Sequence, residues 1–221
     1  MTARLMNLGT RSYLESWEIQ KQVCQEVQEG APDTLILVQH PAVMTLGAAF
    51  QQGNLLLTAA DYEARGIEVV TTDRGGDVTL HNPGQLVIYP IFNLEKHGRD
   101  LHFWMRQLEE TMIHVCGSLG IAARRNPPNT GCWIGDLKVA SMGVKVKKWV
   151  SLHGIALNCC NDLTPFDLIV PCGIPGKPMT SLSQVLGREV RVSEAAKLTL
   201  PTFAEVFGVS FPDLDVQSLE I

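Results

Sequence analysis

The sequence predicts a single domain of mixed α and β structure. Its 221 residues are enough for one domain, and 45% hydrophobic residues is the ordinary share for a folded globular protein. Residues 12–30 and 100–120 repeat apolar side chains at helical spacing, whereas shorter apolar runs between and after them have the length of buried strands. We therefore expect one domain over residues 1–212, followed by a weakly ordered acidic tail at residues 213–221.

Composition excludes several classes of function. The net charge of −5 argues against broad nucleic-acid binding, which relies on many lysine and arginine contacts to phosphate. We find neither a run of about 18 apolar residues nor a secretory signal, which predicts a soluble cytoplasmic protein, or an organellar one if an address segment was removed. The six cysteines are scattered without a C-x-x-C pair, so we expect reduced thiols and no metal site.

The first half of the chain begins with an amphipathic helix and continues into strands. Ser12 and Glu15 have the spacing of a capping box, and Gly30 ends the helical pattern. Further along, the pattern predicts strands at residues 34–39, 44–47 and 67–70, and a short helix at residues 58–66.

Residues 74–85 form the first unusual motif. Twelve positions hold three glycines, an arginine and a histidine, and an apolar strand at residues 86–90 follows. The glycines allow either close approach of the backbone to a ligand or the turns of a hairpin. The segment matches neither the P-loop nor the dinucleotide-binding glycine pattern, so it does not predict a nucleotide site.

The second half of the chain predicts a long helix and a set of strands. Asp100 can cap the helix that ends at Gly120, and residues 124–129 must be a loop. Gly135-Asp136 suits a hairpin turn between short strands. Valines and lysines alternate over residues 143–150, with the valines expected to face inward. The next strand, residues 152–158, is interrupted by Gly154, where a close approach is expected.

Cys172 follows an apolar strand-like segment, residues 167–170, and stands between Pro171 and Gly173. Proline stops strand pairing and glycine permits a sharp turn, so the pattern predicts a thiol exposed at a strand end. After it, Thr180 can cap a short helix ending at Gly187. A second helix can start at Ser193, with Pro201 expected to kink or divide it.

Four motifs, taken together, carry a family resemblance. They are Arg74-Gly75-Gly76-x-x-Thr79-x-His81-x-Pro83-Gly84-Gln85, Lys138-Val139-Ala140-Ser141-Met142-Gly143-Val144, His153-Gly154-x-Ala156-Leu157-Asn158 and Pro171-Cys172-Gly173-Ile174. In this order they resemble the octanoyltransferases of lipoate biosynthesis. Thr180-Ser181-Leu182 also fits, so the resemblance spans about residues 67–190.

The resemblance implies both a fold and an activity. The fold is that of an α/β (α+β) biotin/lipoate protein ligase-like catalytic domain, with a mixed, largely antiparallel sheet flanked by helices. The activity is transfer of an octanoyl or lipoyl group from acyl carrier protein to a specific lysine of lipoyl domains. The implied partners are octanoyl-acyl carrier protein, the lipoyl domains of 2-oxoacid dehydrogenases and the glycine cleavage H protein, and no separate cofactor is implied.

The resemblance also assigns residues. Cys172 would become the acyl thioester and Lys138 would assist it. The implied substrate-binding residues are Arg74, Gly75, Gly76, Asp77, Val78, Thr79, Leu80, His81, Ser141, Met142, Gly143, Gly154, Ile155 and Ala156. His81 and His153 are either proton partners or positioning residues. The chain departs from the family pattern at Asn82, usually a glycine, and at Cys132, usually a small aliphatic residue.

Two other readings remain at the level of the sequence. An ATP-dependent lipoate or biotin ligase on the same fold would form an acyl adenylate and would not need Cys172. A non-catalytic binder of acyl groups or carrier domains would keep the pocket without turnover. Five basic residues either dock an acidic carrier domain or serve as solubilising charge: Arg124, Arg125, Lys145, Lys147 and Lys148.

Overall fold

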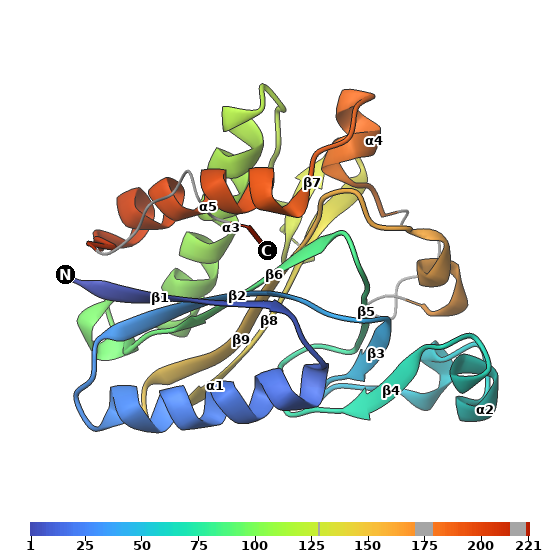
Figure 1. Ribbon diagram of the computed structural model, residues 1–221, viewed down its shortest axis with the longest axis horizontal. Coiled ribbons are helices and arrows are strands. Elements are labelled where there is room, and N and C mark those ends of the chain that lie inside the picture. Colours follow the sequence, from blue (N-terminus) through green and yellow to red (C-terminus); the bar gives the residue numbers. More distant parts are fainter. Residues whose placement is uncertain (128, 171–178, 213–219) are drawn as a thin grey trace.

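The structure is a computed structural model that describes residues 1–127, 129–170, 179–212 and 220–221 (Figure 1). The strands are β1 (Ala3–Thr10), β2 (Asp33–Gln39), β3 (Val43–Leu46), β4 (Glu68–Thr71), β5 (Val78–His81), β6 (Gln85–Ile91), β7 (Cys132–Ile134), β8 (Leu137–Lys147) and β9 (Val150–Asn158). The helices are α1 (Tyr13–Gln28), α2 (Ala59–Glu63), α3 (Leu101–Ser118), α4 (Leu182–Leu186) and α5 (Val192–Phe207), with 3-10 turns η1 (Gln52–Asn54), η2 (Leu94–Lys96) and η3 (Thr164–Leu168).

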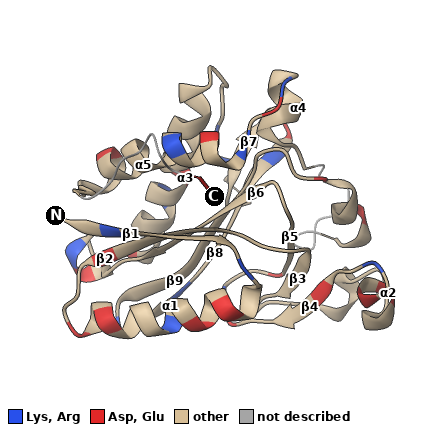
Figure 2. Ribbon diagram, in the orientation of Figure 1, with Lys and Arg blue, Asp and Glu red and all other residues tan. Residues whose placement is uncertain are grey.

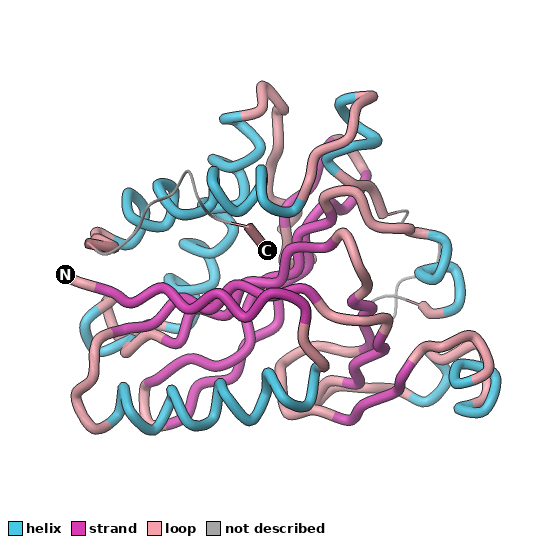
Figure 3. The backbone as a smooth tube through the Cα atoms, viewed as in Figure 1, coloured by secondary structure: helices cyan, strands magenta, loops and turns pink. Residues whose placement is uncertain are grey.

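The strands form two sheets. The larger has the order β1-β2-β6-β9-β8-β7, and all its neighbouring pairs are antiparallel except β1 with β2. The smaller has the order β4-β3-β5, with β3 parallel to β4 and antiparallel to β5. The backbone trace shows the large sheet crossing the middle of the molecule (Figure 3). The expected mixed, largely antiparallel sheet flanked by helices is confirmed.

Helices cover both faces of the large sheet (Figures 1 and 3). On one face, Trp104 of α3 and Phe203 of α5 pack in the same core as Ile88 and Ile155 of the sheet. On the other face, α1 contributes to a separate core that includes Val87 and Tyr89 of β6. Figure 2 shows charged residues mainly on the helices and the periphery, so β6 and β9 form the uncharged centre of the fold.

The two long helices begin at the predicted capping residues. The Ser12 hydroxyl accepts a hydrogen bond from the Glu15 N–H at 3.3 Å and donates one to the Glu15 carboxylate at 2.7 Å. The Asp100 carboxylate accepts hydrogen bonds from the N–H groups of His102 and Phe103 at 2.8 and 3.1 Å. In both helices the cap satisfies a backbone donor that the first turn leaves without a helical partner. These predictions are confirmed.

Some local predictions are wrong. Strand β1 was not predicted, and residues 167–170 are not a strand, because Asp167 and Leu168 complete η3 and Ile169 makes an isolated bridge. The side chain of Ser181, not Thr180, caps α4. Helix α5 begins at Val192 rather than Ser193 and continues through Pro201 without division.

The structure also bears on the predicted hairpin turn at Pro83-Gly84, on the C-terminal tail and on membrane-spanning helices. Strands β5 and β6 do not pair with each other, so Pro83-Gly84 links two sheets instead of closing a hairpin. Most of the expected tail lies outside the described residues, but the backbone oxygens of Glu220 and Ile221 accept hydrogen bonds from the side chains of Asn7 and Gln39. Over the described part of the chain, no helix has the length and apolar character needed to cross a bilayer.

Candidate active site

Two of the sequence motifs meet as neighbours in the large sheet. In the antiparallel register of β8 and β9, Ser141 pairs with Ala156, Met142 with Ile155, and Gly143 with Gly154. A side chain at Gly154 would overlap the carbonyl oxygen of Ile88 on β6. The close approach expected at Gly154 is therefore made by the protein's own backbone.

A narrow cavity of about 60 Å³ lies above these paired motifs, between the two sheets. Its lining residues come from α1, the 74–81 segment, β6, β8, β9, η3 and the start of the segment after residue 178. Val78, Val87 and Phe166 supply apolar surface, and Lys138 supplies a cation. Polar side chains also line the cavity, but its accessible surface is mainly apolar, as is typical of a site for an acyl chain.

Arg74 braces the glycine-rich segment that forms one wall. It is only 7% exposed, and its guanidinium donates hydrogen bonds to the carbonyl oxygens of Thr45, Gly75 and Asp77. The N–H of Gly75 donates to the carbonyl of Val144 on β8 at 2.9 Å. These contacts fix the segment between the small sheet and β8, so the arginine shapes the wall as well as placing positive charge beside the cavity.

Lys138 lies near the start of β8 and is 6% exposed. Its carbonyl accepts a hydrogen bond from the N–H of Thr180 at 3.0 Å, and its backbone pairs with Trp133 of β7. Its Nζ lies 5.5 Å from the centre of the Trp133 ring. The side chain of Lys138 is therefore buried at the cavity, and its backbone is held by Trp133 on one side and by Thr180 on the other.

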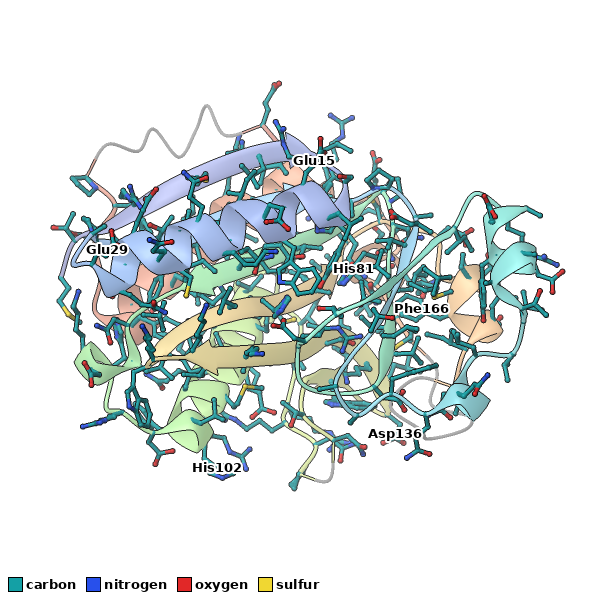
Figure 4. The ribbon with its side chains drawn as sticks, turned by 90° about the horizontal axis from the view of Figure 1, so that it is seen from below. Glu15, Glu29, His81, His102, Asp136 and Phe166 are labelled. Atoms are coloured by element: carbon teal, nitrogen blue, oxygen red, sulfur yellow. The ribbon has the colours of Figure 1, made fainter. Side chains whose placement is uncertain are left out.

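A histidine–tyrosine cluster, consisting of Tyr13, His40, His81, Tyr89 and His153, packs at the α1 side of the cavity. The His81 ring stacks on the Tyr13 ring at a centroid distance of 5.8 Å. Within the cluster, Tyr89 donates its hydroxyl proton to Nε2 of His40, and Tyr13 lies 3.3 Å from Nδ1 of His153. Figure 4 shows His81 in the interior of the molecule.

Contacts outside the cluster fix the protonated nitrogens of its imidazoles. Nδ1 of His40 donates to the carbonyl oxygen of Arg11 at 2.7 Å, and Nδ1 of His81 donates to the side-chain oxygen of Gln85 at 2.8 Å. Nε2 of His153 donates to Asp73 at 2.8 Å. With these partners each ring is a neutral tautomer that needs no second proton.

Burial lowers the pKa of all three histidines. The pKa of His40 falls to about 4 and that of His81 to about 3, mainly because burial disfavours the charged imidazolium. Burial also lowers the pKa of His153, although its hydrogen bond to Asp73 opposes this change. For Asp73, burial raises the pKa, but hydrogen bonds from His153 and Lys145 outweigh it and the net pKa is lowered. The cluster is therefore neutral at pH 7.

The structure brings most of the predicted substrate-binding residues to one cavity. The lining includes Arg74, Gly76, Asp77, Val78, Thr79, His81, Ser141, Met142, Gly143, Gly154, Ile155 and Ala156. Gly75 and Leu80 are not among the lining residues, and Leu80 packs in the core beneath the small sheet. Cys172 lies outside the described residues.

The two departures from the family pattern do not reshape the cavity. Asn82 has an ordinary negative φ, and its side chain bonds the carbonyl of Asp162 and the amide of Asn161, so no glycine is needed there. Cys132 is fully buried and hydrogen-bonded to Cys116 of α3, and it is not among the residues that line the cavity.

Sequence reasoning missed several lining residues. Tyr13, Val87, Tyr89, Phe166 and Met179 all face the cavity, but none belongs to a glycine-rich or lysine-bearing motif. Tyr13 reads as a core position of an amphipathic helix, and Tyr89 as part of an apolar strand. Only the packing of α1 against β6 and β9 reveals that they close a site.

A second hollow lies between α1 and the β8–β9 turn. This open groove of about 820 Å³ is lined mostly by polar and charged side chains, including Glu18, Lys147 and Lys148. Lys147 and Lys148 lie at the opposite end of β8 from Lys138. The other predicted basic residues, Arg124, Arg125 and Lys145, form ion pairs with acidic side chains of this chain.

Known proteins with similar sequences share a name. A family model described as the lipoyl protein ligase A/B catalytic domain matches residues 12–204. An octanoyltransferase of Citrifermentans bemidjiense is 44% identical over 206 residues, which cover 93% of this chain and 98% of the relative. An octanoyltransferase of Syntrophobacter fumaroxidans is 47% identical, with coverage of 87% and 85%.

Solved structures share the fold. A crystal structure of lipoate-protein ligase A bound with ATP has a TM-score of 0.79 at 17% identity and covers 96% of this chain and 87% of its own. Biotin protein ligase from Aquifex aeolicus has a TM-score of 0.53 at 14% identity, with coverage of 94% and 70%. These likenesses confirm the ligase-like fold, and the sequence relatives go further. The chain belongs to the lipoyl protein ligase A/B catalytic domain family and, within it, to the octanoyltransferases.

Proposed function

We propose that this protein transfers an octanoyl group from acyl carrier protein to a lysine of lipoyl domains through a thioester on Cys172. The observation that carries the proposal is the cavity beside Lys138, whose floor is made by the paired motifs Ser141–Gly143 and Gly154–Ala156. The accessible surface of this cavity is mainly apolar, which suits contact with an acyl chain, and the buried lysine provides a proton-carrying group at its side. The relatives named octanoyltransferase support the same acyl group.

The first half of the reaction forms the enzyme thioester. The Cys172 thiolate attacks the carbonyl carbon of the carrier thioester, a new carbon–sulfur bond forms, and the bond to the carrier sulfur breaks. The carrier leaves as a thiol after taking a proton, which Lys138 supplies. A free cysteine has a pKa of about 8.5, and a neighbouring ammonium favours the thiolate, so Lys138 also activates the nucleophile.

The second half transfers the acyl group to the acceptor. The neutral amine of the acceptor lysine attacks the Cys172 thioester, forms an amide, and releases the cysteine sulfur. Lys138 accepts the proton that the amine loses and returns to its starting state. Aminolysis of a thioester to an amide releases free energy. The reaction therefore needs no ATP and no separate cofactor.

The acceptors in this proposal are the lipoyl domains of 2-oxoacid dehydrogenases and the glycine cleavage H protein. To test the transfer, purified protein is mixed with octanoyl-carrier protein and a lipoyl domain in the absence of ATP, and the lipoyl domain is weighed intact. A mass gain of one octanoyl group on the domain is expected.

The same assay separates the two competing functions. An adenylate-forming ligase would modify the domain only when free octanoate and ATP are supplied, and its activity would survive Cys172→Ala. A non-catalytic binder would retain both carriers without changing the mass of either. Either of these results would contradict the proposed transfer.

A further inference from the structure

The side chain of Lys138 lies against a glycine that has no room for a methyl group. Gly131 has a φ of +144°, and a methyl carbon there would lie 2.5 Å from Cε and 3.3 Å from Nζ of Lys138. The same carbon would lie 2.6 Å from the carbonyl oxygen of Ala140. Real carbon atoms do not approach this closely, so a side chain at position 131 would push the end of the Lys138 side chain out of its present position and would also strain the backbone at Ala140.

The backbone of Gly131 is held in place from behind. Its N–H donates a hydrogen bond to Oε1 of Glu109 on α3 at 3.1 Å, and Glu109 is only 3% exposed. The other carboxylate oxygen of Glu109 is paired with Arg106 at 3.1 Å and with Arg125 at 3.2 Å. Because a buried carboxylate with several donors resists displacement, the glycine cannot retreat from the lysine without breaking this network.

The Trp133 ring forms the other support of the lysine. Nζ of Lys138 lies 5.5 Å from the ring centre, within the range of a cation–π interaction. The ring is 1% exposed, and its Nε1 donates to the carbonyl oxygen of Asn129 at 3.1 Å. The Trp133 backbone also exchanges two hydrogen bonds with Arg124. The tryptophan is therefore a fixed surface that favours an ammonium group.

From these contacts we infer that Gly131 and Trp133 are positioning residues that hold the Lys138 amine in the orientation used for acyl transfer. The inference rests on the proposed role of Lys138 in that transfer. Neither residue belongs to the four motifs of the family resemblance. Gly131 provides the space for the lysine stem, and Trp133 provides the attraction that keeps its charged end there.

Among the residues that the structure describes, Glu109 and Cys132 are titratable groups of neighbouring elements that bear on the charge of the lysine. Glu109 of α3 lies behind Gly131 and is paired with two arginines. Cys132 of β7 is a neutral thiol, because its hydrogen bond with Cys116 and its burial raise its pKa far above the ordinary value. Trp133→Leu removes neither group, so its effect on the Lys138 midpoint reports the loss of the aromatic ring.

The test follows Lys138 itself as well as turnover. The whole protein is labelled with trace acetic anhydride at a series of pH values, and the Lys138 peptide is quantified by mass spectrometry, which gives the titration midpoint of that amine. We expect Trp133→Leu to lower this midpoint by about one unit, because it removes the ring that favours the ammonium. Gly131→Ala should lower it by a similar amount, because the added methyl displaces the amine from that ring. Octanoyl transfer should fall at least about tenfold in kcat, with KM for the carrier nearly unchanged.

Two control variants separate positioning from general damage. Trp133→Phe keeps an aromatic face and should restore the midpoint and most of the transfer rate. Gly135→Ala places a methyl at another positive φ, +57°, where no atom lies within 4 Å, and should change neither quantity. Figure 4 shows that the adjacent Asp136 lies at the surface. Thermal unfolding of each variant identifies any that does not fold, and Trp133→Leu tests the inference if Gly131→Ala is lost.

The outcomes distinguish the inference from the function on which it rests. An unchanged Lys138 midpoint in folded Gly131→Ala and Trp133→Leu would overturn the positioning role, whatever happens to turnover. A changed midpoint with an unchanged transfer rate would also overturn it. If the wild-type protein transfers no octanoyl group under any condition, the proposed function fails, whereas the labelling still reports whether the two residues hold the amine.

Discussion

The two sides of the cavity hold titratable groups in opposite ways. At Lys138, one cationic side chain rests between a glycine and a tryptophan ring. In the histidine–tyrosine cluster, several polar side chains bond to one another, to the backbone or to neighbouring side chains such as Gln85 and Asp73, and burial keeps the imidazoles neutral. A group whose proton is fixed by its partners is suited to shaping a wall, whereas a lysine beside the cavity is suited to proton transfer. The first side should therefore govern turnover and the second stability.

The largest effect is expected from Lys138→Ala. Loss of a proton-transferring group costs about 10²- to 10⁴-fold in rate, so octanoyl transfer should fall by at least about 10²-fold. The alkylation rate of Cys172 against pH should also move to higher pH, because the neighbouring ammonium is gone. Lys147→Ala, at the exposed end of the same strand, is the matched control for the thiol and should leave the alkylation profile unchanged. An unchanged alkylation profile in Lys138→Ala would remove the activating role of the lysine.

A change in the histidine–tyrosine cluster should have the reverse signature. His40→Ala leaves the buried Tyr89 hydroxyl without its partner and opens a small cavity, which should lower the free energy of unfolding by about 2–3 kcal/mol. The transfer rate per folded molecule should change far less, because His40 does not line the cavity. Urea unfolding and the transfer assay measure the two effects. His102→Ala, at the outer surface of α3 in Figure 4, is the control for a histidine without such a role.

The neutral histidines predict a loss of stability in acid. The folded-state pKa is about 4 for His40 and about 3 for His81, against an ordinary 6.5. Above pH 6.5 both the folded and the unfolded chain are neutral at these sites. As the pH falls below 6.5, the unfolded chain takes up protons that the folded protein excludes, so the free energy of unfolding decreases until the folded pKa values are reached.

Between pH 7 and pH 5 this linkage should cost on the order of 2 kcal/mol for each of the two histidines. Urea unfolding at a series of pH values measures the slope. A His40→Gln variant should be less stable at pH 7 but should lose less stability on acidification. An equal slope in the variant would show that His40 does not contribute to the acid sensitivity.

The smallest effect is expected at the ion pair on the edge of the histidine–tyrosine cluster. Lys145 contacts Asp73 at 2.9 Å, but both side chains are close to half exposed, so Lys145→Met should change the free energy of unfolding by less than about 1 kcal/mol. The positive charge of Lys145 lowers the pKa of His153, and its removal should raise that pKa. Titration of the His153 ring by NMR measures the direction. A lowered pKa would contradict the assigned contacts.

The features that the sequence predicts well depend on local rules. The caps at Ser12 and Asp100, the hairpin at Gly135 and the family motifs each follow from a few adjacent residues. The features that it misses depend on long-range packing. Strand β1 is recognised as a strand only beside β2, and Tyr13 becomes a cavity residue only when α1 packs on the sheet.

The site shows the same division. The motifs predict that Ser141 to Gly143 and Gly154 to Ala156 matter, but only the register of β8 and β9 explains why they act together. The apolar residues of the segment before Cys172 predict a strand at residues 167–170. In the structure, η3 includes Asp167 and Leu168, and Ile169 forms only an isolated bridge with Leu55. The family motifs include Lys138, but they do not include the glycine and the tryptophan that support it.

The most direct test of the proposed mechanism is the mass of the protein itself after incubation with octanoyl-carrier protein alone. Without ATP or an acceptor domain, the wild-type chain should gain one octanoyl group at Cys172, and addition of a lipoyl domain should remove it and place it on that domain. Cys172→Ala should gain nothing. Lys138→Ala should gain the group much more slowly. Absence of the adduct in the wild type, or an adduct that persists in Cys172→Ala, would contradict the cysteine thioester.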